Sequence, residues 1–439
     1  MGKIQILVEP PGPKAREIIE RDSKVLMQSY VRWLPLVIKA GEGATVIDVD
    51  GNRYIDMNAG IAVLATGHRH PMVIEAIKKQ LDKFLHYSLT DFYYEEAVIL
   101  AERLTSILPG DKVFFTNSGA EAIEGAMKVS RGYFKGARNY FIAFIGSFHG
   151  RTLGALSLTA SKPVHRKWFS PLISTVIHVP YPYCFRCPFK MNRESCNLYC
   201  LEFIEEWVFN KYVPSEEVSA IFIEPIQGEG GYIPAPRDFI IKLRKLADKY
   251  GILLVADEVQ CGMGRTGKWL AIQNYGVNPD IVALAKGIAS GLPLGAIVGR
   301  KEVMNLPPGS HATTFGGNPV SIAASLTTIK LLEEGLMENA RKQGEYLIKR
   351  LLEFKDKYEI VGDVRGLGLM IGMEIVEKDG YTPSPKKMRS IMINSFKRGV
   401  LVIGAGTSTL RFSPPLNISR EEIDEALEII EDEIKKASK

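Results

Sequence analysis

Short apolar runs alternate with amphipathic segments through the middle of the chain, from about Phe114 to Gly299. The apolar runs are rich in β-branched and aromatic residues and are bounded by Gly, Pro, Asn or Asp, which is typical of buried strands. The runs are VFFTN, YFIAFIG, AIFIEP, ILLVADE, DIVALA and GAIVG. Because they alternate with helical segments, they predict a doubly wound α/β domain with a large, mostly parallel sheet.

Two of the segments between these runs have helical spacing. In EAIEGAMKVSRGYF one face carries Ala122, Ile123, Ala126, Met127 and Val129, and in FIIKLRKLADKYG one face carries Ile240, Leu243 and Ala247. Apolar residues at such intervals predict amphipathic helices. We expect each of these helices to bury its apolar face against the sheet.

The pattern changes after Asn318. Long amphipathic segments follow (PVSIAASLTTIKLLEEG and ENARKQGEYLIKRLLEFKDKY), then the strand-like LGLMIGMEIV and LRFSPPL, and a last helical segment in which Ser419 and Glu422 have capping-box spacing. This predicts a small α+β domain over 326–439, joined by the N-terminal segment 1–60. The large domain is expected over 61–325.

Composition and charge narrow the possible partners. The 439 residues are 46% hydrophobic, and the net charge of +5 arises from 55 basic and 50 acidic residues that are mixed along the chain. The sequence has no stripe of basic residues, so a nucleic-acid partner is not expected. The start, MGKIQILVEPPGPK, lacks the features of a signal peptide, and DIVALAKGIASGLPLGAIVG is too interrupted to span a membrane. A cytoplasmic protein without a membrane partner is expected.

Lys286 is the first candidate for chemistry. It follows the apolar run IVALA and precedes Gly287, so its amine is expected at the carboxyl end of a buried strand. Loss of hydration there lowers the pKa of the amine and favours the neutral, nucleophilic form that makes a Schiff base. A solvated surface lysine is the plain alternative, but the apolar run and the turn IASGLPLGA argue against it.

Asp257 and Glu258 end the run GILLVADE, which places a carboxylate at the same edge of the sheet. Open α/β folds bind ligands at that edge. A buried carboxylate needs a cationic partner, and a protonated pyridine nitrogen would serve. A structural salt bridge explains the same residues equally well.

The segment FFTNSGAEAIEG predicts a strand, a turn and a helix that begins near Ser118, Gly119 and Ala120. Free N–H groups at a helix start can bind phosphate, although an ordinary helix cap has the same pattern. The loop from Gly262 to Gly267 matches GxGxxG, but VQC separates it from the strand and Asp280 precedes the next one. NAD binding is therefore not expected.

Four of the five cysteines lie close together in CFRCPFKMNRESCNLYC, at Cys184, Cys187, Cys196 and Cys200. The spacing is compatible with a zinc site, with two disulfides or with reduced thiols. The sequence leaves these three alternatives open, and a structural role is expected for the zinc site or the disulfides. Cys261 stands apart and is expected to be a small packed residue.

Several motifs together resemble the class III aminotransferases of pyridoxal phosphate fold type I. They are TNSGAEA, SFHGRT, EPIQGEGG, ADEVQCGMGRTG, ALAKGIASGLPLGA and TTFGGNP, and the resemblance runs from about Gly41 to the C-terminus. It is nearest to 4-aminobutyrate, ornithine and acetylornithine aminotransferases. The resemblance implies the PLP-transferase fold, pyridoxal 5'-phosphate as cofactor, and a homodimer or higher homo-oligomer with shared active sites.

The resemblance also implies roles for individual residues. Lys286 would form the Schiff base with pyridoxal phosphate and carry the proton, and Asp257 would pair with the pyridine nitrogen. The other implied cofactor contacts are Ser118, Gly119 and Ala120 at the phosphate together with Thr314 of a second subunit, Phe148 and Val259 on the two ring faces, and Gln260 at the ring oxygen. No metal ligand is implied.

The implied reaction moves an amino group from an ω-amino acid, such as 4-aminobutyrate or ornithine, to 2-oxoglutarate. Arg411 and Arg151 would bind substrate carboxylates, since a guanidinium forks onto a carboxylate. Glu229 would neutralise an arginine when the substrate has no second acid. Ile61 matches an apolar pocket position, whereas Thr90 and Asp91 depart from the neutral side chains expected there.

Two further functions are compatible with parts of this pattern. An amino-acid racemase or epimerase of the same family removes the same proton and returns it to either face of the α-carbon, and the cofactor motifs do not separate the two reactions. A non-catalytic binding protein would show a defect in the constellation. The motifs contain none, since Lys286, Asp257, the phosphate turn and Arg411 are all present.

We expect Asp91 to attract a distal ammonium group and so to favour ornithine or lysine over 4-aminobutyrate. A solvated loop carboxylate is the alternative. Replacing it in Asp91→Ala should lower the ratio of kcat/KM for ornithine to that for 4-aminobutyrate, measured under identical conditions. An unchanged ratio would refute the hypothesis.

Overall fold

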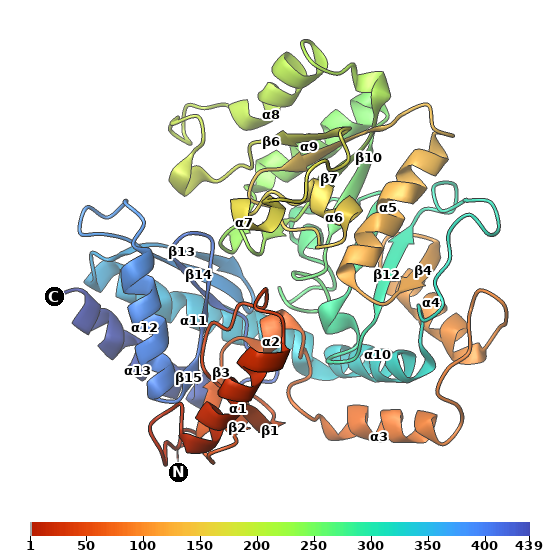
Figure 1. Ribbon diagram of the computed structural model, residues 1–439. Helices are drawn as coiled ribbons and strands as arrows, with labels where there is room; N and C mark the ends of the chain where they lie inside the picture. Colours follow the sequence, from red (N-terminus) through yellow and green to blue (C-terminus); the bar gives the residue numbers. More distant parts are fainter. Residues whose placement is uncertain (1) are drawn as a thin grey trace.

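The computed structural model describes residues 2–439, and its centre is a seven-stranded sheet (Figure 1). The strand order is β4 (Lys112–Thr116), β12 (Gly295–Gly299), β11 (Ile281–Leu284), β10 (Leu253–Asp257), β7 (Val218–Ile223), β5 (Tyr140–Phe144) and β6 (Val176–Val179). Only β12 runs antiparallel to its neighbours. The predicted mostly parallel sheet is therefore confirmed, and each predicted run forms one of its strands.

Helices cover both faces of this sheet, as the fold class requires. Along β5, Phe141 packs with the buried face of α5 (Gly119–Tyr133), whereas the next residue, Ile142, packs on the opposite face with α9 (Arg237–Tyr250). Successive side chains of a strand point to opposite faces, so one buried strand serves two cores. The residues predicted on the inner faces of both helices are all buried.

The C-terminal part contains a second sheet, which is antiparallel and four-stranded. Its order is β13 (Val361–Leu367), β14 (Met370–Ile375), β17 (Thr409–Phe412) and β16 (Ile403–Ala405). The helices of this part are α10 (Pro319–Leu331), the π-helix η6 (Leu332–Leu336), α11 (Met337–Lys357), α12 (Pro385–Lys397) and α13 (Arg420–Ala437). Both strand-like segments of the sequence lie in this sheet.

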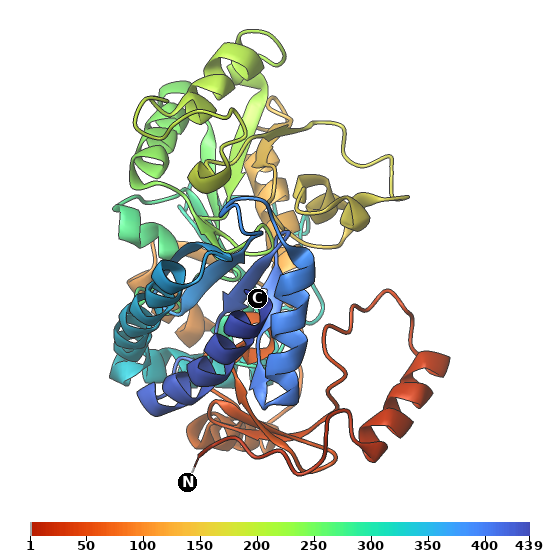
Figure 2. The same cartoon turned by 90° about the vertical axis from the view of Figure 1, so that its left-hand side faces the viewer.

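The N-terminal segment lies against the C-terminal part (Figure 2). Strands β1 (Ile38–Glu42), β2 (Thr45–Asp48) and β3 (Arg53–Asp56) form a sheet that β15 (Val400–Leu401) completes by pairing with β3 in parallel. These hydrogen bonds join the two ends of the chain, while the exact three-part division stays a prediction.

The remaining elements connect or flank these sheets. They are α1 (Pro13–Val25), α2 (Ala59–Ala62), α3 (Pro71–Leu81), α4 (Glu95–Ile107), α6 (Leu153–Leu158), α7 (Pro163–Arg166), α8 (Tyr199–Phe203), the π-helix η2 (Ile204–Phe209), the paired short strands β8 (Ile226–Gln227) and β9 (Ile233–Pro234), and the 3-10 turns η1 (Cys184–Arg186), η3 (Ser215–Glu217), η4 (Ala271–Tyr275) and η5 (Lys286–Ile288). Across residues 2–439, no helix combines the length and the apolar character needed to cross a membrane.

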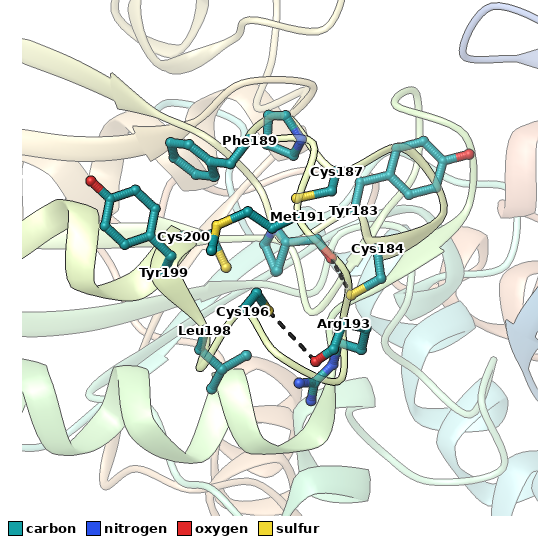
Figure 3. A pocket seen from close by; sticks show the side chains of 12 residues that line it. Tyr183, Cys184, Cys187, Phe189, Met191, Arg193, Cys196, Leu198, Tyr199 and Cys200 are labelled. Atoms are coloured by element: carbon teal, nitrogen blue, oxygen red, sulfur yellow. Dashed lines mark hydrogen bonds between the residues drawn. The ribbon is translucent and has the colours of Figure 1, made fainter.

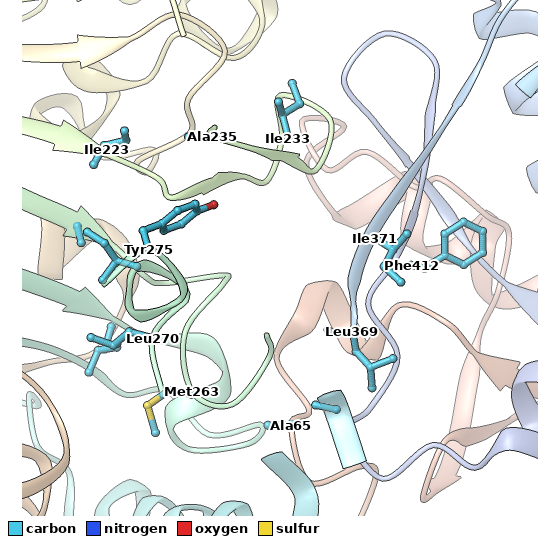
Figure 4. Packing of buried hydrophobic residues seen from close by; sticks show 14 of the residues in the cluster. Ala65, Ile223, Ile233, Ala235, Met263, Leu270, Tyr275, Leu369, Ile371 and Phe412 are labelled. Carbon is cyan, nitrogen blue, oxygen red and sulfur yellow. The ribbon is translucent and has the colours of Figure 1, made fainter. Parts of the chain in front are cut away.

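One apolar cluster extends from the large sheet to the C-terminal sheet (Figure 4). Ile223 and Tyr275 from the side of the large sheet belong to the same buried cluster as Ile371 and Phe412 of the small sheet. Burial of such side chains fixes the two sheets relative to each other. The two sheets therefore share one buried core.

The predicted capping box of α13 is present, because Ser419 Oγ accepts from the Glu422 N–H at 3.2 Å and the Glu422 carboxylate accepts from the Ser419 N–H at 2.9 Å. Loss of such a cap costs about 1 kcal/mol. We expect Ser419→Ala to lower the free energy of unfolding by that amount, measured by urea denaturation. The control Ser438→Ala, at the other end of the helix, should cost less, and an equal loss in both variants would contradict the capping role.

Candidate active site

A cavity of about 400 Å³ lies at the carboxyl edge of the large sheet. That volume is within the usual range for small-molecule sites. Its walls include Ser118, Gly119, Ala120, Phe148, Arg151, Asp257, Val259, Gln260 and Lys286. The fold thus brings to one cavity every residue predicted to contact a cofactor except Thr314.

Lys286 begins the turn η5, two residues after β11 ends, in a strained backbone conformation with a φ of 48°. A non-glycine residue in the left-handed region carries a conformational cost and is common at functional sites. Burial lowers the pKa of the Lys286 amine below its usual value; Arg411 lowers it further, while the Glu229 and Asp257 carboxylates oppose the shift. The site therefore favours a neutral, nucleophilic amine.

Asp257 ends β10, which pairs in parallel with β11. Its Oδ2 lies 2.7 Å from His149 Nδ1, and its Oδ1 accepts the Val259 N–H at 3.0 Å. Burial alone would lower the pKa of His149, but the hydrogen bond and charge of Asp257 raise it above its usual value. The hydrogen bond gives the buried carboxylate a fixed orientation.

Sequence reasoning missed His149, although it lies in the quoted motif SFHGRT. It also missed Glu224, a buried wall residue that accepts the N–H groups of Phe148 at 2.9 Å and Gly228 at 3.0 Å. Burial raises the pKa of Glu224 to about 7, with the Asp257 charge adding to the effect. The only available signal was that both lie inside quoted motifs, His149 in SFHGRT and Glu224 at the start of EPIQGEGG.

Glu258 has a different place from Asp257. Its carboxylate accepts the N–H groups of Ala271 and Ile272, each at 2.8 Å, and burial raises its pKa to about 7. It is not part of the cavity wall. Of the two adjacent carboxylates, only Asp257 therefore faces the cavity, and Glu258 stabilises the loop behind it.

The start of helix α5 forms another part of the wall. Ser118 caps the helix through its hydroxyl, which accepts the Glu121 N–H at 3.2 Å. The N–H groups of a first helical turn have no partner inside the helix. Val259 leaves no room for a side chain at Gly119, since a Cβ there would lie 2.7 Å from Val259 Cγ1. The backbone is thus open to an anion at this point.

Two buried polar atoms in this region have no hydrogen-bond partner among residues 2–439. They are Gln260 Oε1 and His149 Nε2. Buried polar atoms are rarely left unpaired in native proteins, so each unpaired atom needs an explanation. A bound molecule with its own polar atoms explains an unpaired amide of Gln260 in the cavity wall.

Arg411 lies on β17 and is almost fully buried. Its Nη1 donates to Glu229 Oε1 at 2.6 Å. Burial raises the pKa of Glu229, but Arg411 and then Lys162 outweigh that effect and bring the pKa to about 2. The ion pair therefore persists at neutral pH, and Glu229 masks the guanidinium.

Arg151 has a different environment. It is exposed, lies in the cavity wall, and its guanidinium carbon is 5.2 Å from the centre of the Phe148 ring. It forms no ion pair with any residue of the 2–439 range. Arg151 thus offers open donors to a ligand carboxylate from the cavity wall, whereas the masked Arg411 and its partner Glu229 are not among the residues that line the cavity.

Ile61, Thr90, Asp91 and Thr314 are not brought to the cavity wall of the same chain. All four are exposed. Thr90 Oγ1 donates to the carbonyl of Thr313 at 3.4 Å, so the segments of Thr90 and Thr314 are neighbours at the surface. The Asp91 hypothesis gains no contact within one chain.

The loop GMGRTG is structural, which agrees with the expectation that it does not bind a dinucleotide. Arg265 is buried and its guanidinium donates to the carbonyls of Leu369, at 3.2 Å, and Pro414. A Cβ at Gly264 would meet Leu332 at 2.7 Å. The loop therefore packs against the C-terminal part and presents no open cradle.

The four clustered cysteines line a separate cavity of about 20 Å³ (Figure 3). All are free thiols. Burial raises the pKa of Cys200 to about 12, and the neighbouring cysteines add to this effect. Among residues 2–439, no three His, Cys, Asp or Glu side chains are arranged as metal ligands. The structure shows free thiols at these positions, and the metal-bound alternative stays a prediction; Cys261, as expected, is buried.

Comparison with known proteins places this geometry in context. The model of the family described as "Aminotransferase class-III" matches residues 26–434. The alanine/serine racemase of Pyrococcus horikoshii is 43% identical, over 98% of this chain and 92% of that protein. The leucine/methionine racemase of Thermococcus litoralis is 39% identical (95% of each chain), and the acetylornithine aminotransferase of Archaeoglobus fulgidus is 40% identical (94% and 99%).

Solved structures agree with the sequence comparisons. An aminotransferase from Bacillus anthracis superimposes with a TM-score of 0.89 at 31% identity, covering 96% of this chain and 99% of that one. An amine transaminase from an uncultivated Pseudomonas species, in its PLP-bound form, gives 0.86 at 31% identity, over 94% and 97%. The predicted fold class is confirmed by these matches.

Proposed function

The chain belongs to the class III aminotransferase family, and from that premise we propose that it moves an amino group from an ω-amino acid to 2-oxoglutarate. It is an enzyme that depends on pyridoxal 5'-phosphate, as this family does. The amino donor that we propose is 4-aminobutyrate, ornithine or a similar compound. The proposal rests on how the two arginines of the site are presented.

The cavity residues fit the cofactor. In the proposed arrangement the start of α5 holds the phosphate, Phe148 and Val259 enclose the ring, Gln260 donates to the ring oxygen, and Asp257 faces the pyridine nitrogen. Orientation of Asp257 by His149, at 2.7 Å, supports its part in this arrangement. Bound here, pyridoxal phosphate supplies an electron sink for the bond that breaks at the amino-bearing carbon.

Lys286 both anchors the cofactor and carries the proton in this proposal. Burial lowers its pKa below the usual value of a lysine, which favours the free amine that acts as a base. The strained φ of 48° holds the lysine at the turn directly after β11. Both features support the proposal that this one amine acts as the base at the reacting carbon.

The observation that carries the proposal is the ion pair of Arg411 with Glu229, at 2.6 Å. An ω-amino acid has no carboxylate beside its reacting amine, so a bare buried guanidinium there would lack a partner. Glu229 supplies the missing charge. 2-Oxoglutarate does carry a carboxylate beside its reacting carbon, and it binds Arg411 once Glu229 moves aside, with Arg151 taking the second acid.

Amino-acid racemisation is the second candidate. The alanine/serine racemase and the leucine/methionine racemase are 43% and 39% identical to this chain. An α-amino acid has a carboxylate beside its amine in every step, so a racemase would have no use for the masking of Arg411. The proposal of amino transfer therefore rests on the ion pair of Arg411 with Glu229. The alternative of racemisation rests on the sequence identity to the two racemases.

We also propose that a second copy of the chain completes the site. Beside Thr90 and Thr314 the surface carries large exposed aromatic side chains, including Tyr93, which is 99% exposed, and Phe315, which is 58% exposed. The rings of Phe315 and His86 lie 4.8 Å apart in a tilted arrangement, and those of Tyr87 and Phe92 meet edge to face at 4.7 Å, so these aromatic residues come from the two neighbouring segments. Extended exposed apolar patches mark association surfaces.

The assay that tests the proposed function uses the purified enzyme loaded with pyridoxal phosphate. We expect glutamate to form from 2-oxoglutarate only when 4-aminobutyrate or ornithine is present. Lys286→Ala should abolish this activity, by at least about 10³-fold, because it removes both the anchor and the base. The same variant should lose the absorbance band near the edge of the visible range.

The contrary result is equally specific. If an L-α-amino acid loses its optical rotation without 2-oxoglutarate, and no ω-amino acid yields glutamate, the enzyme is a racemase and the proposal of amino transfer is wrong.

A further inference from the structure

Glu229 has a second cationic neighbour besides Arg411. Its Oε2 lies 3.7 Å from Lys162 Nζ, whereas its Oε1 lies 2.6 Å from Arg411 Nη1. The two oxygens of one carboxylate therefore face two different cations. Sequence reasoning assigned no role to Lys162, which follows the SFHGRT segment by about ten residues.

Glu229 needs another cationic partner whenever it leaves Arg411, and Lys162 can be that partner. Arg411 binds a substrate carboxylate only when Glu229 leaves it, and Glu229 is itself largely buried, with 18% of its side chain exposed. A buried carboxylate that loses its cation is strongly destabilised unless another cation receives it. The open state of the pocket thus needs a second partner for Glu229.

Among the charged and titratable groups near Glu229, Lys162 is the one that can act as its second cationic partner. After burial, which raises the pKa of Glu229, the groups that lower it are, in order, Arg411, Lys162 and Lys286. In the proposed function Lys286 is committed to the cofactor. Burial, together with the charges of Arg151 and Lys162, lowers the pKa of the nearby His165 to about 4, so this imidazole is neutral at physiological pH.

Lys162 is also held in position for this task. It is the residue before α7, its side chain is only 26% exposed, and its Nζ lies 5.8 Å from the centre of the Trp33 ring. Within residues 2–439 its one ion pair is with Glu229. An aromatic face restrains a lysine without neutralising it, so the ammonium keeps its charge for Glu229.

We propose that Lys162 is a specificity-determining positioning residue that receives Glu229 whenever a substrate carboxylate takes Arg411. Glu229 then moves between two cations and is never left without one. Lys162 stabilises the open state of the pocket, which 2-oxoglutarate and α-amino acids require. The closed state, which an ω-amine uses, depends on it less, because Arg411 there lies closer to Glu229, at 2.6 Å against 3.7 Å for Lys162. This inference rests on the proposed function only for the identity of the substrates.

The test compares Lys162→Met, which keeps the length of the side chain but removes its charge, with Lys162→Arg, which keeps the charge. Binding of 2-oxoglutarate to the pyridoxal-loaded enzyme, measured by calorimetry, should weaken about tenfold in Lys162→Met, as expected for one charge interaction of ~1.4 kcal/mol. Lys162→Arg should retain most of the affinity. For the substrate 4-aminobutyrate, KM should change less than about twofold.

Lys167→Met serves as the matched control, because Lys167 is exposed in the same segment and lies over Trp168 instead of Glu229. It should bind 2-oxoglutarate as the unaltered enzyme does. Equal losses for 2-oxoglutarate and 4-aminobutyrate in Lys162→Met would indicate a general structural role, and unchanged 2-oxoglutarate binding would also overturn the inference.

The result remains interpretable if the proposed function fails. For a racemase, the carboxylate of an α-amino acid displaces Glu229 in the same way, so Lys162→Met should raise the KM for that amino acid by a similar factor. Amino transfer with normal 2-oxoglutarate binding in Lys162→Met refutes the role of Lys162 alone. Absence of amino transfer with weakened binding refutes the proposed function alone.

Discussion

The buried ion pair between Arg411 and Glu229 is the constraint on which the chemistry of the pocket depends. A guanidinium that is 2% exposed must have a negative partner, supplied either by the protein or by the ligand. The protein supplies one from the loop after β8, and the Glu229 carbonyl accepts the Gly406 N–H at 2.9 Å, which ties this loop to the C-terminal sheet. The ion pair and this hydrogen bond therefore join the two parts of the fold.

The need of a buried charge for a partner also applies to the carboxylates in the cavity wall. Asp257 is buried at the end of β10 and has His149 as its hydrogen-bonded neighbour, while Glu224, without such a direct partner, has its pKa raised to about 7 by burial. Parallel strands end at one edge, so Asp257 and Lys286, from adjacent strands, come to face a common space. The charges of this edge are arranged by the sheet before any ligand binds.

Much of the large sheet could be predicted from the sequence, because buried parallel strands consist of short runs of apolar residues. The strand β6 was missed, since Val176–Val179 is short and contains His178. The antiparallel direction of β12 is not encoded in periodicity and became visible only in the pairing with β11 and β4. Whether a strand runs parallel or antiparallel depends on its contacts with other strands, and the sequence of one segment does not show these contacts.

For the site, residues at strand ends and at a helix start could be found by position. Lys286, Asp257 and Ser118 all have such positions, and all line the cavity. His149 and Lys162 could not be found in this way, because each matters through a partner about 70 to 110 positions away, and only the fold brings the pairs together. Ile61 and Thr90 remain outside the cavity of one chain, so a single-chain pattern could not place them.

The central claim is that Glu229 alternates with the substrate as the partner of Arg411. The most direct measurement is the kcat/KM of Glu229→Gln for 4-aminobutyrate and for 2-oxoglutarate, each in its own half of the reaction. The account predicts a fall of at least about tenfold for 4-aminobutyrate, whose closed pocket loses its counter-charge, and little loss for 2-oxoglutarate, which brings its own. An equal change for the two substrates would contradict it.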